Sequence, residues 1–396
     1  NRFDITLHPP TIIFLYLTSR SWVLASSWPY FTLLGQSIGS LVLAWDSFSL
    51  LVPDIFLDTM GYAFSLAFCR LLFPHIPTGA YVHYPTISTD MISSLRPGPL
   101  SETQGVNGGK GAGIIGIVKK LYWILFAQAY SLAGGSIDVV MSNSSWTQDH
   151  LQSLWQPWRL KFYKTAPTVV YPPVAVDALV REIDISSSGE IKRQPILLYI
   201  SQYRAEKNHR LILRSFAKFK NIKTHSSADA KLVFVGSVRG SEDSVRIEEL
   251  RSLTNELNMK DSVKFHLDAS WPEILGWLSR SSIGVNGMWN EHFGIGVVEY
   301  QAAGLIPVVH NSGGPQQDIV RMIDGKPTGF HANTADDYAT CFETIFNMTE
   351  QERLEMRVRA RKNAQKFNEN AFATAWIKQM ERLVQLQEEF SLQKEG

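Results

Sequence analysis

The sequence predicts an α/β protein built from two Rossmann-like domains, each with a doubly wound parallel sheet. One observation is length: 396 residues with 45% hydrophobic content exceed one ordinary domain and can fill two cores. The other is order, because short β-rich runs alternate with amphipathic runs through the second half of the chain. Such βαβα alternation indicates parallel strands that are covered by helices on both faces.

The alternation is clearest from Pro195 onward. Residues 195–201 (PILLYIS) predict a strand, 209–219 (HRLILRSFAKF) a helix, and 231–237 (KLVFVGS) the next strand. The series continues through VKFHLD, WPEILGWLSR, SIGVNGM, a helix from about Gly294, and IPVVHN. These segments predict one complete Rossmann-like domain.

The first half repeats this pattern less completely. Strand-like runs at 54–59, 79–85, 138–144 and 168–174 are separated by helical ones. A polar, Ser-rich connection follows, and the chain ends in good helix formers. The predicted units are residues 1–185 as a partial first domain, 194–365 as the second domain, and 366–396 as a carboxy-terminal helix packing back on the first.

Composition excludes some classes of function. The 38 basic and 37 acidic residues nearly cancel, so no global field would hold a nucleic acid. Cys69 and Cys341 lie far apart and predict neither a disulfide framework nor a thiolate metal site. The sequence has no Asp-x-Asp triplet after a strand, so no metal is expected at a diphosphate.

Two stretches allow more than one interpretation. Residues 121–141 carry a single charge, Asp138, which approaches the pattern of a membrane span. The Gly-Gly break and the β-rich end favour a buried helix that runs into a core strand. Lys119 and Lys120 beside its aromatic residues would also suit shallow docking on a bilayer. The Gly-rich segment 97–113 predicts a loop rather than a phosphate cradle, since no strand leads into it.

The EHFGIGVVE segment is the strongest candidate site. Glu291 and Glu299 stand eight positions apart around a helix that starts near Gly294 and Ile295. The free amides of a first helical turn favour a phosphate. Glu291 could then reach a sugar, and Glu299, roughly 7 Å along the axis, could accept hydrogen bonds from a ribose. Alternatively, Glu291 caps the helix and Glu299 is a solvated surface residue.

A second candidate follows the strand 195–201. Arg204 and Lys207 fall in its β-to-α loop, and such loops line the crevice where doubly wound sheets bind ligands. The two cations could embrace a diphosphate, Arg204 with a planar fork and Lys207 as a compact charge. Taken alone, cations in this position are commonly just solvated.

His83 ends a strand of the first domain and could hydrogen-bond a sugar hydroxyl, although a structural role satisfied by backbone groups is also open. Gly236, Arg239 and the segment 311–319 (NSGGPQQDI) follow strands and could approach a nucleotide. Their signal is weak because glycine-rich turns after strands are common.

The residues quoted above resemble glycosyltransferase family 4, retaining enzymes of the GT-B fold whose E-x7-E motif and Arg/Lys pair grip a sugar nucleotide. Longer strings narrow the resemblance to the dolichol-linked oligosaccharide alpha-1,2-mannosyltransferases and cover almost the whole chain. They are YVHYPTISTDM, WPYFTLLGQSIGS, DTMGYAF, SQYRAEKNH, TGFHA and MWNEHFGIGVVEYQAAGLIPVVHNSGGP.

The resemblance implies transfer of mannose from GDP-mannose, with retention, as the fourth and fifth mannoses of a dolichol-linked glycan on the cytosolic face of the endoplasmic reticulum. It also implies contact with the membrane surface and with other mannosyltransferases of the pathway. Matching positions suggest Arg204 and Lys207 at the diphosphate, Glu299 at the ribose, Glu291 at the donor mannose and His83 at the reaction centre.

Members of this family usually begin with a membrane-anchoring helix and a first strand with a Gly-rich loop, which do not appear before NRFDITLHPP. The sequence therefore predicts an amino-terminally truncated first domain. Two alternatives to the active enzyme stay open: a GT-B donor-binding fragment with impaired catalysis, and a family 4 transferase with another donor or acceptor.

Overall fold

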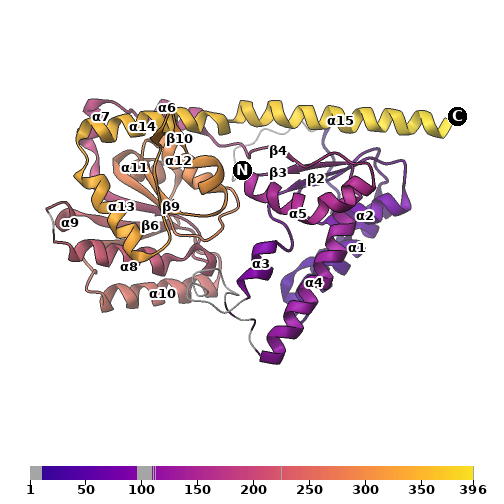
Figure 1. Cartoon of the computed structure of the whole chain (residues 1–396), viewed down its shortest axis with the longest axis horizontal. Coiled ribbons are helices and arrows are strands. Elements are labelled where there is room, and N and C mark those ends of the chain that lie inside the picture. The colour runs from indigo at the N-terminus through magenta and orange to yellow at the C-terminus, as the bar shows by residue number, and fades with distance from the viewer. Residues whose placement is uncertain (1–10, 96–108, 110, 112, 224, 396) are drawn as a thin grey trace.

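The computed structural model describes residues 11–95, 109, 111, 113–223 and 225–395. It contains two α/β units side by side, bridged by a long carboxy-terminal helix (Figure 1). Each unit has a wholly parallel main sheet. The predicted fold class, two Rossmann-like parallel-sheet domains, is confirmed.

The first domain is built on a sheet of order β1-β2-β3-β4. Its strands alternate sides as a pleated chain must: Ala80 and Val82 face helices, whereas Tyr81 faces the opposite layer. All four strands match runs predicted from the sequence. Their bounds, with those of the main helices, are β1 Phe56–Asp58, β2 Thr78–Val82, β3 Val139–Ser142, β4 Thr168–Val169, α1 Thr32–Leu50, α2 Ala63–Leu72, α4 Gly113–Gly135 and α5 Ser145–Lys161.

The second domain has six parallel strands in the order β12-β9-β8-β5-β6-β7. Helices α8, α10 and α13 cover one face and α6, α11, α12 and α14 the other. The strands are β5 Gln194–Ile200, β6 Lys231–Gly236, β7 Val263–Leu267, β8 Ser281–Asn286, β9 Ile306–His310 and β12 Phe330–Ala332. The helices are α6 Val176–Glu182, α8 His209–Asn221, α10 Ser241–Glu256, α11 Trp271–Arg280, α12 Ile295–Ala303, α13 Ala335–Asn347 and α14 Glu350–Ala364.

Short elements complete the connections. They are the turns of 3-10 helix η2 Thr18–Val23, η3 Ala25–Ser27, η5 Ala205–Lys207 and η7 Gln365–Phe367, the helices α3 Thr89–Ser94, α7 Ser187–Lys192 and α9 His225–Asp229, the π-helical turn η6 Pro315–Ile319, and the hairpin of β10 Met322–Ile323 with β11 Lys326–Pro327.

The connection between the two sheets holds a helix that its polar composition did not predict. α7 lies within residues 181–194, and the buried carboxylate of Glu190 in this helix pairs with Arg353 at 2.8 Å and Arg357 at 2.7 Å. Arg357 also donates to the carbonyls of Ser282 and Gly304. Because these arginines come from α14, long-range ion pairing fixes a segment without local apolar periodicity.

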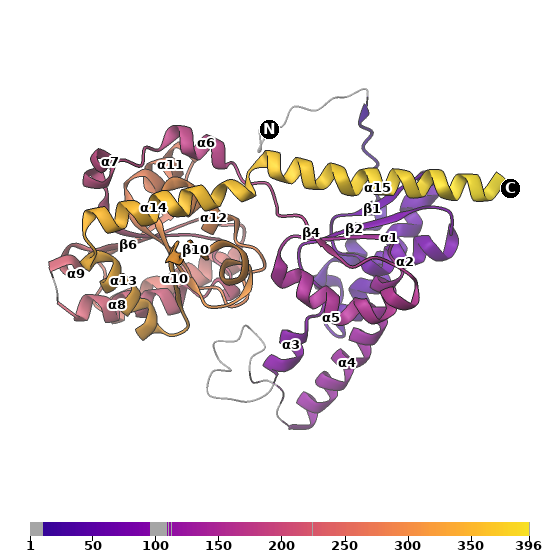
Figure 2. The same ribbon diagram turned by 45° about the horizontal axis from the view of Figure 1, so that its top comes forward.

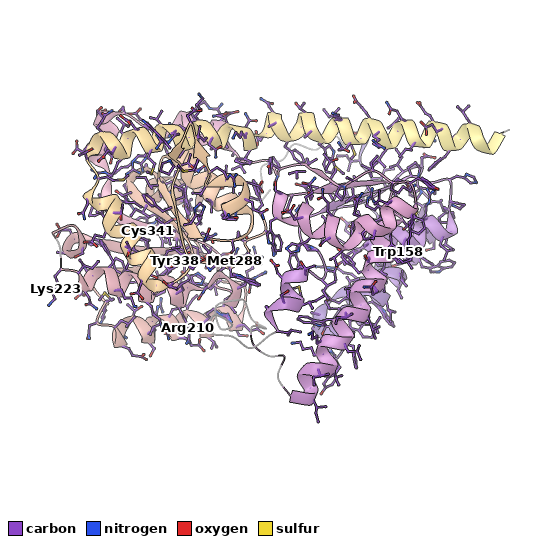
Figure 3. The ribbon with its side chains drawn as sticks, in the orientation of Figure 1. Trp158, Arg210, Lys223, Met288, Tyr338 and Cys341 are labelled. Atoms are coloured by element: carbon purple, nitrogen blue, oxygen red, sulfur yellow. The ribbon has the colours of Figure 1, made fainter. Side chains whose placement is uncertain are left out.

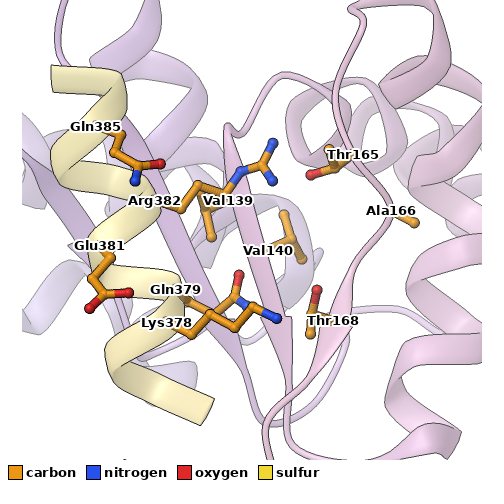
Figure 4. A pocket seen from close by; sticks show the side chains of 10 residues that line it. All are labelled: Val139, Val140, Thr165, Ala166, Thr168, Lys378, Gln379, Glu381, Arg382 and Gln385. Carbon is orange, nitrogen blue, oxygen red and sulfur yellow. The ribbon is translucent and has the colours of Figure 1, made fainter. Parts of the chain in front are cut away.

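The last helix, α15 Glu369–Glu395, leaves the second domain and lies along the first (Figure 2). Phe372 and Trp376 of α15 pack against Tyr81. This packing covers the face of the sheet opposite α4 and α5. Between α15 and β3 lies an open hollow of about 480 Å3, into which Figure 4 shows the side chains of Lys378 and Arg382 projecting.

Helix α4 follows the prediction of a helix that runs into a core strand, since β3 begins four residues after it. Trp123, Phe126 and Tyr130 are buried on one side, whereas Ile117 and Leu121 are exposed on the other. No helix among the described residues is long and apolar enough to cross a membrane. The predicted Gly-rich loop 97–113 falls almost entirely outside the described residues.

Both cysteines are free and buried, in agreement with the absence of a predicted disulfide. Burial raises the pKa of the Cys69 thiol to about 12 and that of Cys341 to about 11. Neither thiol is therefore a ready nucleophile at neutral pH.

Candidate active site

A cavity of about 420 Å3 opens between the two domains, at the carboxyl ends of their strands. His83, Asn143 and Pro172 line it from the first domain. The second domain contributes the end of β5, the end of β8 and the start of α12. Crevices at this edge of parallel sheets are where such folds bind ligands.

The amino end of α12 provides free backbone donors in this cavity. Gly294 is the residue before the helix and has φ of 103°, a left-handed conformation that favours glycine. No side chain caps the helix, and the Gly294 carbonyl takes the amides of Val297 and Val298. The amides of Ile295 and Gly296 lie in the first turn, where no intrahelical acceptor exists. The arrangement suits an anionic group.

Lys207 and Glu291 meet at the floor of the cavity. Lys207 Nζ donates to Glu291 Oε2 at 2.5 Å, and Asn286 Nδ2 donates to the same oxygen at 3.3 Å. Lys207 Nζ also lies 3.2 Å from the sulfur of Met288, which is labelled in Figure 3. The structure thus brings together two candidates that are 84 positions apart in the chain.

Arg204 is not brought into this cavity. Its guanidinium is half exposed and lies 3.9 Å from Glu206. It lines a neighbouring open hollow together with Arg239 and Arg246. The backbone of Arg204 is extended immediately before η5, and its guanidinium lies near Glu206 of the same loop.

Glu299 lies in the middle of α12, with its carboxylate next to Gly296, and it is not among the residues that line the cavity. Loss of hydration raises the pKa of Glu299 to about 7. Near pH 7 this carboxyl group is therefore partly ionised. Hydrogen bonds from ligand hydroxyl groups would favour the ionised form.

His83 stands at the cavity wall directly after β2, and its ring meets the edge of Tyr81 at 4.6 Å between centroids. Loss of hydration lowers the pKa of His83, and the nearby carboxylate of Asp58 partly opposes that effect. The imidazole is therefore neutral at pH 7 and can both donate and accept a hydrogen bond.

The weaker candidates differ in position. Gly236 ends β6 and does not itself line the cavity, but a Cβ at this position would lie 2.2 Å from the carbonyl oxygen of Ser201, which does. Segment 311–319 instead supports the turn that carries Glu291: Gly314 donates its amide to the Glu291 carbonyl at 2.8 Å. A side chain on Gly313 or Gly314 would collide with this turn, which explains the glycine pair.

Sequence reasoning missed Asn286, Asn143 and His292, which all line the cavity. Asn286 is the last residue of β8, so its position at the end of a strand was an available signal. His292 stands beside Glu291 inside the quoted motif. Burial lowers the pKa of His292 to about 4, so its ring is neutral at pH 7.

The residues that the structure describes contain no group of three or more His, Cys, Asp or Glu side chains arranged to hold a metal ion. The expectation that the donor is bound without a metal stays a prediction.

Comparison with solved structures identifies the fold. A UDP-forming alpha,alpha-trehalose-phosphate synthase from Burkholderia xenovorans has a TM-score of 0.66 at 12% identity, covering 89% of this chain and 79% of that one. Anabaena HepE in complex with UDP and glucose has a TM-score of 0.57 at 13% identity, covering 87% and 81%. At these identities the likeness concerns the fold alone, and that fold is GT-B.

Sequence comparison identifies the family. The model "ALG11 mannosyltransferase N-terminus" matches residues 1–155, and "Glycosyl transferases group 1" matches 180–367. The GDP-Man:Man(3)GlcNAc(2)-PP-Dol alpha-1,2-mannosyltransferase of Neurospora crassa is 59% identical over 391 residues, which cover 97% of this chain and 70% of that protein. Its Homo sapiens counterpart is 41% identical over 393 residues, covering 96% and 76%. The chain is therefore a glycosyltransferase and belongs to this family of alpha-1,2-mannosyltransferases.

Proposed function

We propose that this protein transfers mannose from GDP-mannose to a dolichol-diphosphate-linked oligosaccharide, with retention of configuration, and adds the fourth and fifth mannoses. The observation that carries the proposal is the convergence of the uncapped α12 amino end, Lys207 and Glu291 on one cavity between two GT-B domains. The printed activity of relatives that share almost the whole chain supports the choice of donor and acceptor.

The geometry suggests a role for each group around the donor. The amides of Ile295 and Gly296, together with Lys207, would stabilise the charge that develops on the departing GDP, which is the role of fixed donors in a partly buried site. Arg204 would reach the same diphosphate from the neighbouring loop once its exposed side chain turns. No bound metal is needed for these contacts.

The remaining groups would contact the sugars. Glu299 would accept hydrogen bonds from the ribose, and Glu291 would contact hydroxyls of the donor mannose, where its pairing with Lys207 keeps it next to the diphosphate. His83 approaches from the first domain and would hydrogen-bond the reacting sugar.

A direct test supplies the purified chain with GDP-mannose and a detergent-solubilised lipid-linked trimannosyl acceptor. Two added mannoses, in alpha-1,2 linkage, are expected by mass spectrometry and mannosidase digestion. Glu291→Gln, which keeps the size of the side chain, is the matched variant and should strongly reduce transfer.

Binding of GDP-mannose without any product would instead favour a donor-binding fragment with impaired catalysis. Transfer from another sugar nucleotide at a comparable rate would favour a family 4 transferase with a different donor. Either result would overturn the proposed reaction.

The first domain suggests where the protein meets the membrane that holds a dolichol-linked acceptor. Exposed apolar side chains recur at helical spacing along α4. Lys119 lies toward the buried side of the helix, with its Nζ 4.9 Å from the centroid of the Trp123 ring. The amino end of α1 lies alongside, since the amide of Leu34 donates to Tyr122 of α4. The exposed apolar residues of this α4 face are Ile114, Ile117, Val118, Leu121, Ile124, Leu125 and Leu132.

We propose that this α4 face rests on the cytosolic surface of the endoplasmic reticulum membrane. A helix with exposed apolar side chains along one face suits shallow insertion at the headgroup level. Association with other mannosyltransferases of the pathway stays a prediction.

Vesicle flotation tests the docking. Ile114→Ser, Ile117→Ser and Leu121→Ser together should weaken binding to anionic vesicles at least about tenfold, because each side chain loses apolar burial. A matched control changes three exposed apolar residues of the second domain, Ile222, Val245 and Val358, to serine. Equal loss in both triple variants would contradict docking through α4.

A further inference from the structure

The turn between β8 and α12 is held firmly within its own domain. Asn290 has φ of 52° in the left-handed region, and its amide donates to Ser312 Oγ at 2.7 Å. The next carbonyl, that of Glu291, accepts the amide of Gly314 at 2.8 Å. The backbone on which the Glu291 side chain stands is therefore fixed from the second domain.

The same turn is also held from the first domain, on both sides of Glu291. Before it, Asn290 Nδ2 donates to Asp90 Oδ2 in α3 at 2.7 Å. After it, the ring of His292 stacks on Tyr84 with 4.1 Å between centroids and 24° between planes. Contacts of this length join residues about 200 positions apart in the chain.

The partners in the first domain are themselves ordered by a small network. Asp90 Oδ2 lies 3.4 Å from His150 Nε2, and His150 Nδ1 lies 2.9 Å from Thr89 Oγ1. Trp146 packs edge-on against His150 at 4.2 Å and lies 5.5 Å from His292, nearly parallel to it. Asp90 is thus held in place to accept the hydrogen bond, and its interaction with His150 lowers the pKa of the carboxyl group.

The ring of His292 is placed to support the turn by stacking. Its low pKa leaves it neutral near pH 7, and it lies face to face with an aromatic ring. A neutral, stacked ring contributes area and orientation. Asn290 likewise contributes an amide that cannot titrate.

We infer that Asn290 and His292 are positioning residues that clamp the first domain on either side of Glu291 and so hold its carboxylate at the donor mannose. The inference rests on the proposed role of Glu291. It adds that contacts from the first domain refine the position of a turn already held by the second, since a small displacement of a reacting group lowers turnover steeply.

The test for His292 separates stacking from chemistry. His292→Ala should lower kcat about tenfold, with a KM for GDP-mannose changed less than about threefold and an unchanged Kd for GDP. His292→Phe keeps a planar ring on Tyr84 and should restore most of the lost turnover. Failure of Phe to rescue a folded protein would show that the imidazole itself is required and would overturn the inference.

The test for Asn290 uses its partner. Asp90→Ala, Asn290→Ala and the double variant should lower kcat by similar factors, because all three remove the same hydrogen bond. If the loss of kcat in the double variant equals the product of the two single losses, the two residues do not act through a shared contact. The control for His292→Ala is His75→Ala, because His75 is an exposed histidine near the opposite end of β2.

Melting temperatures are measured for every variant, so that a loss of folding is recognised. Failure of the proposed function is distinguishable: it would appear as an inactive wild type, whereas failure of this inference would appear as an active wild type with unaffected variants.

Discussion

The two domains treat their apolar side chains in opposite ways. The second domain buries strands on both faces of its sheet, and its exposed large apolar residues are few and scattered. The first domain leaves many of them in the open, along α4, at the amino end of α1 and before it. These exposed side chains are the basis of the docking surface proposed above.

The charged groups show the reverse distribution. The candidate donor site draws its ion pair and its helix terminus from the second domain, whereas the first domain lines it with the uncharged side chains of His83, Asn143 and Pro172. The difference is consistent with the proposed division of tasks, in which the second domain binds the anionic donor and the first domain meets the membrane. Each prediction below separates these two tasks.

The largest effect is expected at Lys207. Lys207→Ala should reduce kcat by about 100-fold or more, since a fixed cation next to the leaving group acts mainly in the transition state. Vesicle binding should stay as in the wild type, because Lys207 is remote from α4. Steady-state kinetics measures turnover, and flotation measures vesicle binding. Loss of both in a folded Lys207→Ala variant would contradict the assignment of the two tasks to different domains.

A smaller effect is expected at Glu299, and it depends on pH. If the ionised carboxylate accepts ribose hydroxyls, the affinity for GDP-mannose should rise roughly tenfold from pH 6 to pH 8, because the pKa of the free site is about 7. GDP-mannose is the suitable probe, since its diphosphate diester does not titrate in this range. Calorimetry of wild type and Glu299→Gln checks it, and an equally steep pH dependence in the variant would contradict the assignment.

The same group predicts the pH dependence of stability. The folded-state pKa is raised above the usual 4.5, so the contribution of Glu299 is most favourable below pH 4.5 and is lost as the pH rises to about 7. Above pH 7, the free energy of unfolding of Glu299→Gln should therefore exceed that of wild type by at most about 3 kcal/mol. Denaturant titration measures this difference. The gain should disappear near pH 4.5.

The smallest effect is expected at Arg204. Arg204→Ala should lower kcat about threefold to tenfold, because its exposed side chain is screened by solvent and is ordered only when the donor binds. Raising the salt concentration should reduce the difference from wild type. A loss as large as that of Lys207→Ala, insensitive to salt, would show that the guanidinium is fixed in the cavity of the working enzyme.

Much of the fold could be predicted because the local spacing of apolar residues indicates strands and helices. The sequence pattern predicted β5 to β9, the helices α8, α11 and α12, and the four strands of the first domain. It did not name α10, α13 or β12. The helix α7 was missed, since its stability comes from the distant arginines Arg353 and Arg357. Charge pairing over such separations leaves no trace in the spacing of apolar residues.

The candidate site was predictable only in part. Lys207, Glu291 and the start of α12 could be placed at one sheet edge because parallel strands end there together. The direction of Arg204 could not be predicted, because a long exposed side chain is set by its neighbours in the loop. Nor could the position of His292 beside Tyr84, since it requires the two domains to meet.

The sequence by itself determined two parallel sheets, the order of their strands along the chain and the motif that ends in the α12 helix. Tertiary structure decided which groups touch: Lys207 with Glu291, Asn290 with Asp90, and His292 with Tyr84. The physical reason is the range of the interactions along the chain. Backbone conformation follows from near neighbours, whereas a site is made by side chains that packing brings together from distant parts of the chain.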